Sequence, residues 1–176
     1  GHGPHVRGGT PPTRVALSHM VGSSAASRWV GHLPLFVAGA LSIVAGGLVA
    51  AVSGPTDWAH GSWVAAFLVL VAGVAQVGAA AGQAHLAPTA RSVGFIVAEC
   101  AAWNVAGLTV ITGTLVSSPT IVTAGSALLA AALAMSAFAV GASSHPSRLL
   151  LWSFRALLGV LLMSIPVGIT LTWIRN

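Results

Sequence analysis

The sequence predicts an all-α integral membrane protein, a bundle of five transmembrane helices with its N-terminus in the cytoplasm and its C-terminus outside. Composition is the first of three observations behind this prediction, because 56% of the 176 residues are hydrophobic and only 5% are charged. Soluble domains carry about a quarter of their residues as Asp, Glu, Lys and Arg. So few charges cannot cover a water-facing surface, and lipid must be the solvent. The other two observations are five long apolar runs and a one-sided distribution of arginine.

Five runs are long enough to cross the hydrocarbon core, which takes roughly 20 consecutive apolar residues in a helix. The predicted spans are residues 33–53, 63–83, 93–116, 120–141 and 149–173. We expect Pro34 in the first turn of the first span, where a missing N–H costs little, and we expect Pro166 to kink the last span. A β-barrel would need short segments that alternate with period two. These runs are continuously apolar, so helices are predicted.

The polar segment over residues 1–31 is expected to be disordered, with the five-helix domain over residues 32–176. Residues 1–19 are rich in Gly, Pro and His and show no apolar period. Three interpretations of these residues stay open: a cytoplasmic tail, a cloning remnant, or translated sequence upstream of a true start at Met20. None of the three predicts a folded element.

Five spans place the connections on two sides of the membrane. Side A holds the N-terminal segment and the loops 84–92 and 142–148, and side B holds the loop 54–62, the turn 117–119 and the C-terminus. Five arginines lie on side A, Arg155 lies one to two turns inward from it, and only Arg175 lies on side B. This bias follows the positive-inside rule. It predicts that side A is cytoplasmic and that the protein is a multi-pass protein of a bacterial inner (plasma) membrane.

Glu99 and Arg155 are charged residues inside predicted spans. Each lies seven residues from the side A end of its helix, so each is roughly 10 Å inside the boundary. A lone charge at that depth costs several kcal/mol. We therefore expect the two side chains to face each other between the third and fifth helices. Such a pair either locks the register of the helices or lines a polar path, and the alternative for Arg155 is to extend to the interface.

The candidate intramembrane polar cluster consists of five residues: Glu99, Arg155, Gln76, Asn104 and Gln83. Gln76 and Gln83 are seven residues apart and share one face of the second helix. If the polar faces converge, the bundle holds a hydrogen-bonded or wet core that reaches mid-membrane. The alternative is that Gln76 and Asn104 hold helices together, each contributing about 0.5–2 kcal/mol. We favour this alternative, because no comparable polar set completes a route to side B.

No catalytic, cofactor or metal site is predicted. With Cys100 as the single cysteine, a multi-cysteine metal site is not possible. Asp57 and Glu99 are the two acidic residues and lie on different sides of the bilayer, which excludes two-carboxylate chemistry. Beyond the three histidines of residues 1–19, His32, His85 and His145 lie on side A, and His60 lies on side B. They are interpreted as surface residues, and a haem between His32 and His85 is a weaker alternative.

The leading functional hypothesis is a non-enzymatic structural or accessory membrane component. Beyond the lipid bilayer, its partner would be a second copy or another membrane protein, packed against small-residue helix faces such as Gly78-x-x-x-Gly82. The second hypothesis is a channel or transporter for a small solute or ion, and the third is a haem-binding redox subunit. The basic balance does not indicate nucleic-acid binding, because seven arginines are spread over the whole chain.

Overall fold

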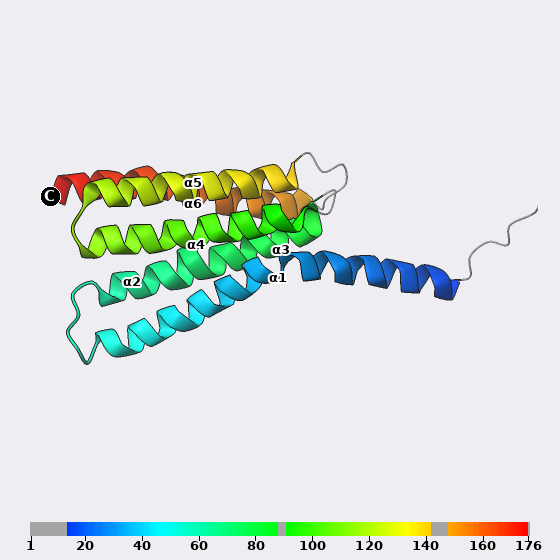
Figure 1. The fold of residues 1–176 in the computed structure, drawn as a ribbon, viewed down its shortest axis with the longest axis horizontal. Helices are drawn as coiled ribbons and strands as arrows, with labels where there is room; N and C mark the ends of the chain where they lie inside the picture. The colour runs from blue at the N-terminus through cyan, green and yellow to red at the C-terminus, as the bar shows by residue number, and fades with distance from the viewer. Residues whose placement is uncertain (1–13, 88–90, 142–147, 176) are drawn as a thin grey trace, which may run out of the picture.

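The computed structural model describes residues 14–87, 91–141 and 148–175, and this part of the chain is all-helical (Figure 1). The elements are α1 (Arg14–Ser53), α2 (Gly61–Phe67), the π-helical segment η1 (Leu68–Ala75), α3 (Gln76–Leu86), α4 (Val93–Leu115), α5 (Pro119–Val140) and α6 (Arg148–Arg175). Among the described residues, five helical stretches are long and apolar enough to cross a membrane: Val30–Ser53, Gly61–Leu86, Val93–Leu115, Pro119–Val140 and Arg148–Thr170. These stretches correspond to the five predicted spans, and α2, η1 and α3 together form the second one.

The first helix is longer than expected, because α1 begins at Arg14 and runs through Pro34. Residues 14–31 are therefore helical and not disordered as expected, while residues 1–13 lie outside the described residues. This stretch contains no proline that would end a helix, so a helix nucleated in the membrane can extend through it. Pro34 accordingly lies inside the helix and not in its first turn. The N-terminal part of α1 projects away from the bundle (Figure 1).

The two ends of the bundle carry the connections as the alternation of five spans predicts. The α1–α2 loop, the α4–α5 turn and the C-terminal end of α6 lie at one end, which is side B (Figure 1). The starts of α4 and α6 lie at the other end, which is side A. The cytoplasmic location of side A stays a prediction from the arginines.

The tight turn between α4 and α5 is closed by two backbone hydrogen bonds. Ser118 N donates to Gly113 O over 2.8 Å, and Ser117 N donates to Thr114 O over 3.2 Å. Ser117 has a φ of 52°, the left-handed conformation that ends a helix in this way. Pro119 follows as the first residue of α5, where its missing N–H costs nothing. The turn brings α4 and α5 together as the most extensively packed pair of helices.

The small-residue motif Gly78-x-x-x-Gly82 packs against α6 of the same chain. A Cβ added at Gly82 would lie 2.3 Å from Cδ2 of Phe154, and one added at Gly78 would lie 3.0 Å from Cδ2 of Leu157. This close approach is the usual basis of helix association in lipid. Gly94 behaves differently, because an added Cβ there has no heavy atom within 4 Å in the described part of the chain.

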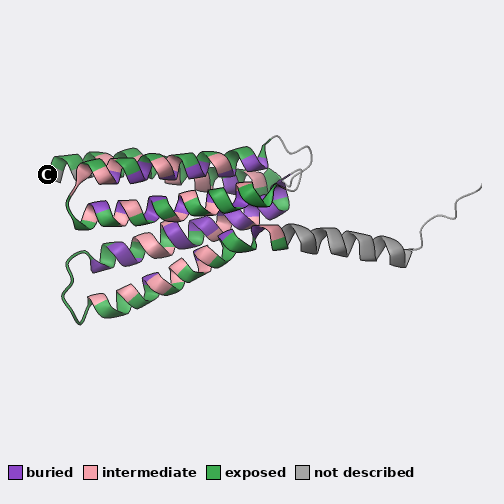
Figure 2. Ribbon diagram, viewed as in Figure 1, coloured by how far each residue is buried: buried purple, intermediate pink, exposed green. Residues whose placement is uncertain are grey.

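Burial is uneven among the five spans. The buried share is 44% for the most apolar stretch of Gly61–Leu86 but only 6% for that of Arg148–Thr170. Figure 2 shows the same contrast, with buried residues concentrated on the second span and on the facing sides of α4 and α5. The second span therefore forms the centre of the bundle, and α6 lies at its margin.

Candidate intramembrane polar site

Glu99 lies at the centre of a buried polar cluster in the half of the membrane near side A. Its side chain has no exposed surface. Its Oε1 accepts hydrogen bonds from Gln83 Nε2 at 2.6 Å and from Ser136 Oγ at 2.5 Å. The three residues come from α3, α4 and α5, so the carboxyl group joins three spans. Glu99 Oε2 is also buried and has no hydrogen-bond partner among the described residues.

A fourth span contributes His32. This residue lies on α1, is 4% exposed and interacts electrostatically with Glu99. The sequence interpretation of His32 as a surface residue is therefore wrong. The sequence placed residue 32 at the exposed start of the first span. Because α1 begins at Arg14, residue 32 instead lies within a helix that packs against its neighbours. We call His32, Gln83, Glu99 and Ser136 the Glu99 cluster.

Gln76 and Asn104 lie next to this cluster and meet at Cys100. Gln76 is fully buried, and its Nε2 lies 3.8 Å from Cys100 Sγ. Asn104 Nδ2 donates to the carbonyl of Cys100 over 2.7 Å, which is a bond within its own helix. The second contact of this amide nitrogen, 3.6 Å from Cys100 Sγ, also lies within α4. Cys100 Sγ in turn lies 3.7 Å from the carbonyl oxygen of Pro34 on α1.

Arg155 is the predicted member that the structure separates from the others. Its side chain is exposed on α6, whereas Glu99 is fully enclosed. In the described part of the chain, the hydrogen bonds of the Glu99 carboxyl group come from Gln83 and Ser136. The expected Glu99–Arg155 pair is wrong, because neutral donors hold the carboxyl group instead. An exposed arginine one to two turns from side A fits the alternative of a side chain that extends to the interface.

Two contributors to this end of the bundle were missed by sequence reasoning. Ser136 is one of many small residues in α5, and nothing in its spacing marks it as a partner of Glu99. Arg91 was counted only for its charge, yet its Nη2 donates to the carbonyls of Phe138 and Ala139 at 3.0 and 3.1 Å. These carbonyls belong to the last turn of α5, where helical partners are absent and a cation is favourable. Arg91 thus fastens the end of α5 near the cluster.

Trp103 lies one turn further toward side B on α4. It is fully buried, and its Nε1 donates to the carbonyl of Val71 over 3.2 Å. Val71 belongs to η1, where the wider i→i+5 pattern replaces that of an α-helix. The indole thereby joins α4 to the irregular part of the second span. Sequence reasoning placed Trp103 in mid-membrane but could not anticipate this acceptor.

A cavity of about 730 Å³ enters the bundle from side B. Its lining includes five polar residues: His60, Thr114, Ser117, Ser126 and Ser164. Val71 and Leu129 also line it, and each lies ten residues from the side B end of its helix, which is about 15 Å. The cavity therefore reaches mid-membrane. Thr114 and Ser126 contribute hydroxyl groups to this cavity toward side B, whereas Thr112 is exposed.

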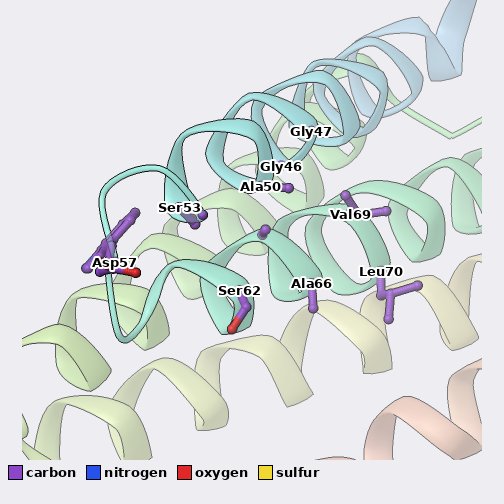
Figure 3. Close-up of a pocket in the computed structure, with 12 residues that line it drawn as sticks. Gly46, Gly47, Ala50, Ser53, Asp57, Ser62, Ala66, Val69 and Leu70 are labelled. Carbon is purple, nitrogen blue, oxygen red and sulfur yellow. The ribbon is translucent and has the colours of Figure 1, made fainter.

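A second hollow, about 790 Å³ in volume, lies between α1 and the α2–η1 segment at side B (Figure 3). Gly46, Ala50 and Val69 line its floor, and Asp57 lies exposed at the loop end with a φ of 49°. The hydroxyl of Ser53 donates to its own helix at Val49 O. Asp57 is the ionisable residue of this lining, and it lies in the exposed loop rather than inside the bundle.

In the described residues, no three His, Cys, Asp or Glu side chains come together as a metal site would require. A bis-histidine haem needs two imidazoles on facing helices at equal depth. His32 is buried beside Glu99, whereas His85 is exposed near the end of α3 and His145 lies outside the described residues. Comparison of the chain with protein-family models, with curated proteins and with solved structures gives no match. The function must therefore be argued from the site itself.

Proposed function

We propose that this multi-pass membrane protein conducts a small cation, with the proton as the smallest case, and that Glu99 is its intramembrane binding group. The observation that carries the proposal is the unequal hydrogen bonding of the two oxygens of the Glu99 carboxyl group. Oε1 accepts two hydrogen bonds, while Oε2 is buried without a partner among the described residues. A carboxyl group that served only to fix helix packing would be expected to have both oxygens satisfied.

The surroundings of Glu99 favour a positively charged ligand. Gln76 Oε1 and Gln83 Oε1 are buried and, like Glu99 Oε2, have no donor within the described part of the chain. The site thus holds a surplus of acceptor oxygens, the ligand type that protons, water and hard cations seek. An acidic residue inside the membrane is costly and is a functional-site candidate by default, with ion pathways and proton relays among its known roles.

Flux in liposomes tests the proposal. Purified protein is reconstituted, and the fluxes of protons, Na⁺ and K⁺ are followed with ion-sensitive dyes under an imposed membrane potential. We expect flux of one of these cations in the wild type and at least a tenfold loss in Glu99→Gln. Asp57→Asn is the matched control, because it removes the other acidic residue from an exposed loop, and it should retain the flux. Absence of all three fluxes in the wild type, or equal flux in Glu99→Gln, would contradict the proposal.

The accessory role expected from the sequence has support from α6. This helix is the least buried span, and large apolar side chains such as Trp152, Val160 and Met163 are 67–70% exposed. Gly159 lies among them, and an added Cβ there meets no described heavy atom within 4 Å. A membrane partner packed on α6 would be displaced by Gly159→Leu, whereas the isolated bundle would tolerate this change. Co-purification of one partner with the wild type and its loss in Gly159→Leu would support the accessory role. An unchanged partner, or none, would contradict it.

A further inference from the structure

We infer that the side B cavity is the entrance to Glu99 and that the indole of Trp103 is the barrier between them. The inference rests on the proposed function, because it assigns the route by which a cation reaches the Glu99 cluster. If side A is cytoplasmic, as the arginines predict, this entrance opens to the outside.

The inner end of the cavity is formed by residues that pack around Trp103. Val71 and Leu129 line the cavity; Leu129 belongs to the buried hydrophobic cluster that contains Trp103, and Val71 packs against that cluster. The hydrogen bond from Trp103 Nε1 to Val71 O fixes the ring against this inner wall. The indole therefore lies directly behind the deepest part of the cavity.

A single helical turn separates this barrier from the carboxyl group. Trp103 lies twelve residues before the side B end of α4 at Leu115, which is about 18 Å, and Glu99 lies about 6 Å deeper. Both side chains are fully buried and project from the same face of α4. Movement of one side chain would thus join the cavity to the Glu99 cluster.

The lining of the cavity suits a hydrated cation. Its volume of about 730 Å³ corresponds to some twenty water molecules. The hydroxyls of Thr114 and Ser164 donate to backbone carbonyls of their own helices, at 2.9 and 2.7 Å. Their oxygen lone pairs therefore remain as acceptors for a cation or its water. No arginine or carboxylate is among the lining residues, so an ion would pass through without being trapped.

Accessibility of introduced cysteines tests the entrance. In a Cys100→Ala background, Ser126→Cys places a thiol in the cavity, and Leu108→Cys places one on the exposed outer surface of α4. Both positions lie seven residues from the side B ends of their helices, about 10 Å deep. A membrane-impermeant quaternary-ammonium thiosulfonate added from side B should modify Ser126→Cys at least tenfold faster, because lipid excludes the reagent from Leu108→Cys. Asp57→Cys is the freely accessible reference.

The native Cys100, adjacent to Glu99, tests the barrier. With the same reagent added from side B, we expect little modification of Cys100 in the wild type and in Trp103→Phe, and at least tenfold faster modification in Trp103→Ala. Equal rates in folded Trp103→Ala and wild type would overturn the assignment of Trp103 as the barrier.

The outcomes separate the two proposals. If Ser126→Cys reacts no faster than Leu108→Cys, the cavity is not the entrance, and this comparison needs no change at Trp103. Cation flux that depends on Glu99 would then persist by another route. If the labelling succeeds but the wild type carries no flux, the proposed function itself is contradicted.

Discussion

The half of the bundle near side A is closed, whereas the half near side B is hollow, although both halves carry polar residues within apolar helices. Near side A, Gln83 and Ser136 converge on one carboxyl oxygen, and Gly82 lets Phe154 of α6 pack directly against α3. Near side B, the hydroxyl groups of Thr114 and Ser126, which also lie within apolar helices, line a cavity of about 730 Å³. An isolated polar residue in a transmembrane helix therefore indicates depth but does not distinguish an interhelical bond from a cavity wall.

The size of the residues on the central span explains much of the difference. Toward side A, α3 presents alanine and glycine, and the neighbouring helices approach closely. Toward side B, Trp63 and Phe67 stack with their ring centroids 5.4 Å apart, and both line the cavity. The packing partners differ accordingly, because α3 packs against both α5 and α6, whereas α2 and η1 pack mainly against α1. The contrast between the two halves leads to four predictions, given from the largest expected effect to the smallest.

Replacement of Trp103 by alanine should have the largest effect, because this side chain closes the boundary between the two halves. Removing a fully buried aromatic ring and its hydrogen bond to Val71 O is expected to cost about 3–5 kcal/mol of unfolding free energy. Trp152→Ala is the control, since Trp152 is 67% exposed. Unfolding in mixed micelles with increasing SDS measures both. Similar losses in the two variants would mean that Trp103 is not part of the packed core.

Gly82→Ala should destabilise the closed half by about 1–3 kcal/mol, because the added methyl group would overlap the ring of Phe154. Gly94→Ala introduces the same group where no described atom lies within 4 Å. That change should be neutral or slightly stabilising, since alanine favours the helix over glycine. The same unfolding assay compares the pair. Equal unfolding free energies of the two variants would mean that α3 and α6 are not tightly packed at Gly82.

Glu99→Leu should cost about 0.5–2 kcal/mol, because the Gln83 and Ser136 donors would lose their shared acceptor inside the membrane. Glu99→Gln retains an acceptor oxygen and should cost less than Glu99→Leu. Thermal unfolding in detergent distinguishes them. If Glu99→Gln is less stable than Glu99→Leu, the hydrogen bonds to Oε1 contribute nothing to the stability of the half near side A.

Two serines on α5 give the smallest and most direct comparison. Ser136→Ala removes a donor to Glu99 and should cost up to about 1–2 kcal/mol. Ser126→Ala changes a cavity wall, and its effect should stay within about 0.5 kcal/mol. Both residues are buried in the same helix, so helix propensity cancels between the variants. A larger loss for Ser126→Ala would show that the side B half is packed as tightly as the other.

Part of the candidate site could be predicted from the sequence. Gln83 and Glu99 lie close together as the shared depth of their helices suggests, and Gln76 reaches the adjacent Cys100. Arg155 has the same depth as Glu99 by residue count but lies on an exposed part of α6. Depth is a one-dimensional property of a helix, whereas a contact also requires that two helices be neighbours and be rotated toward each other.

The sequence by itself determined the number of apolar spans, their approximate positions and the end of the bundle at which each connection lies. The thickness of the hydrocarbon core and the rise of an α-helix set these features, and both act on each span separately. Only the tertiary structure decided that His32 and Ser136 join Glu99, that Gly78 and Gly82 contact α6, and that η1 offers Val71 O to Trp103. The physical reason is that these spans are apolar on all sides. In lipid, close packing of small surfaces sets the rotation of each helix, and this packing depends on all five spans together.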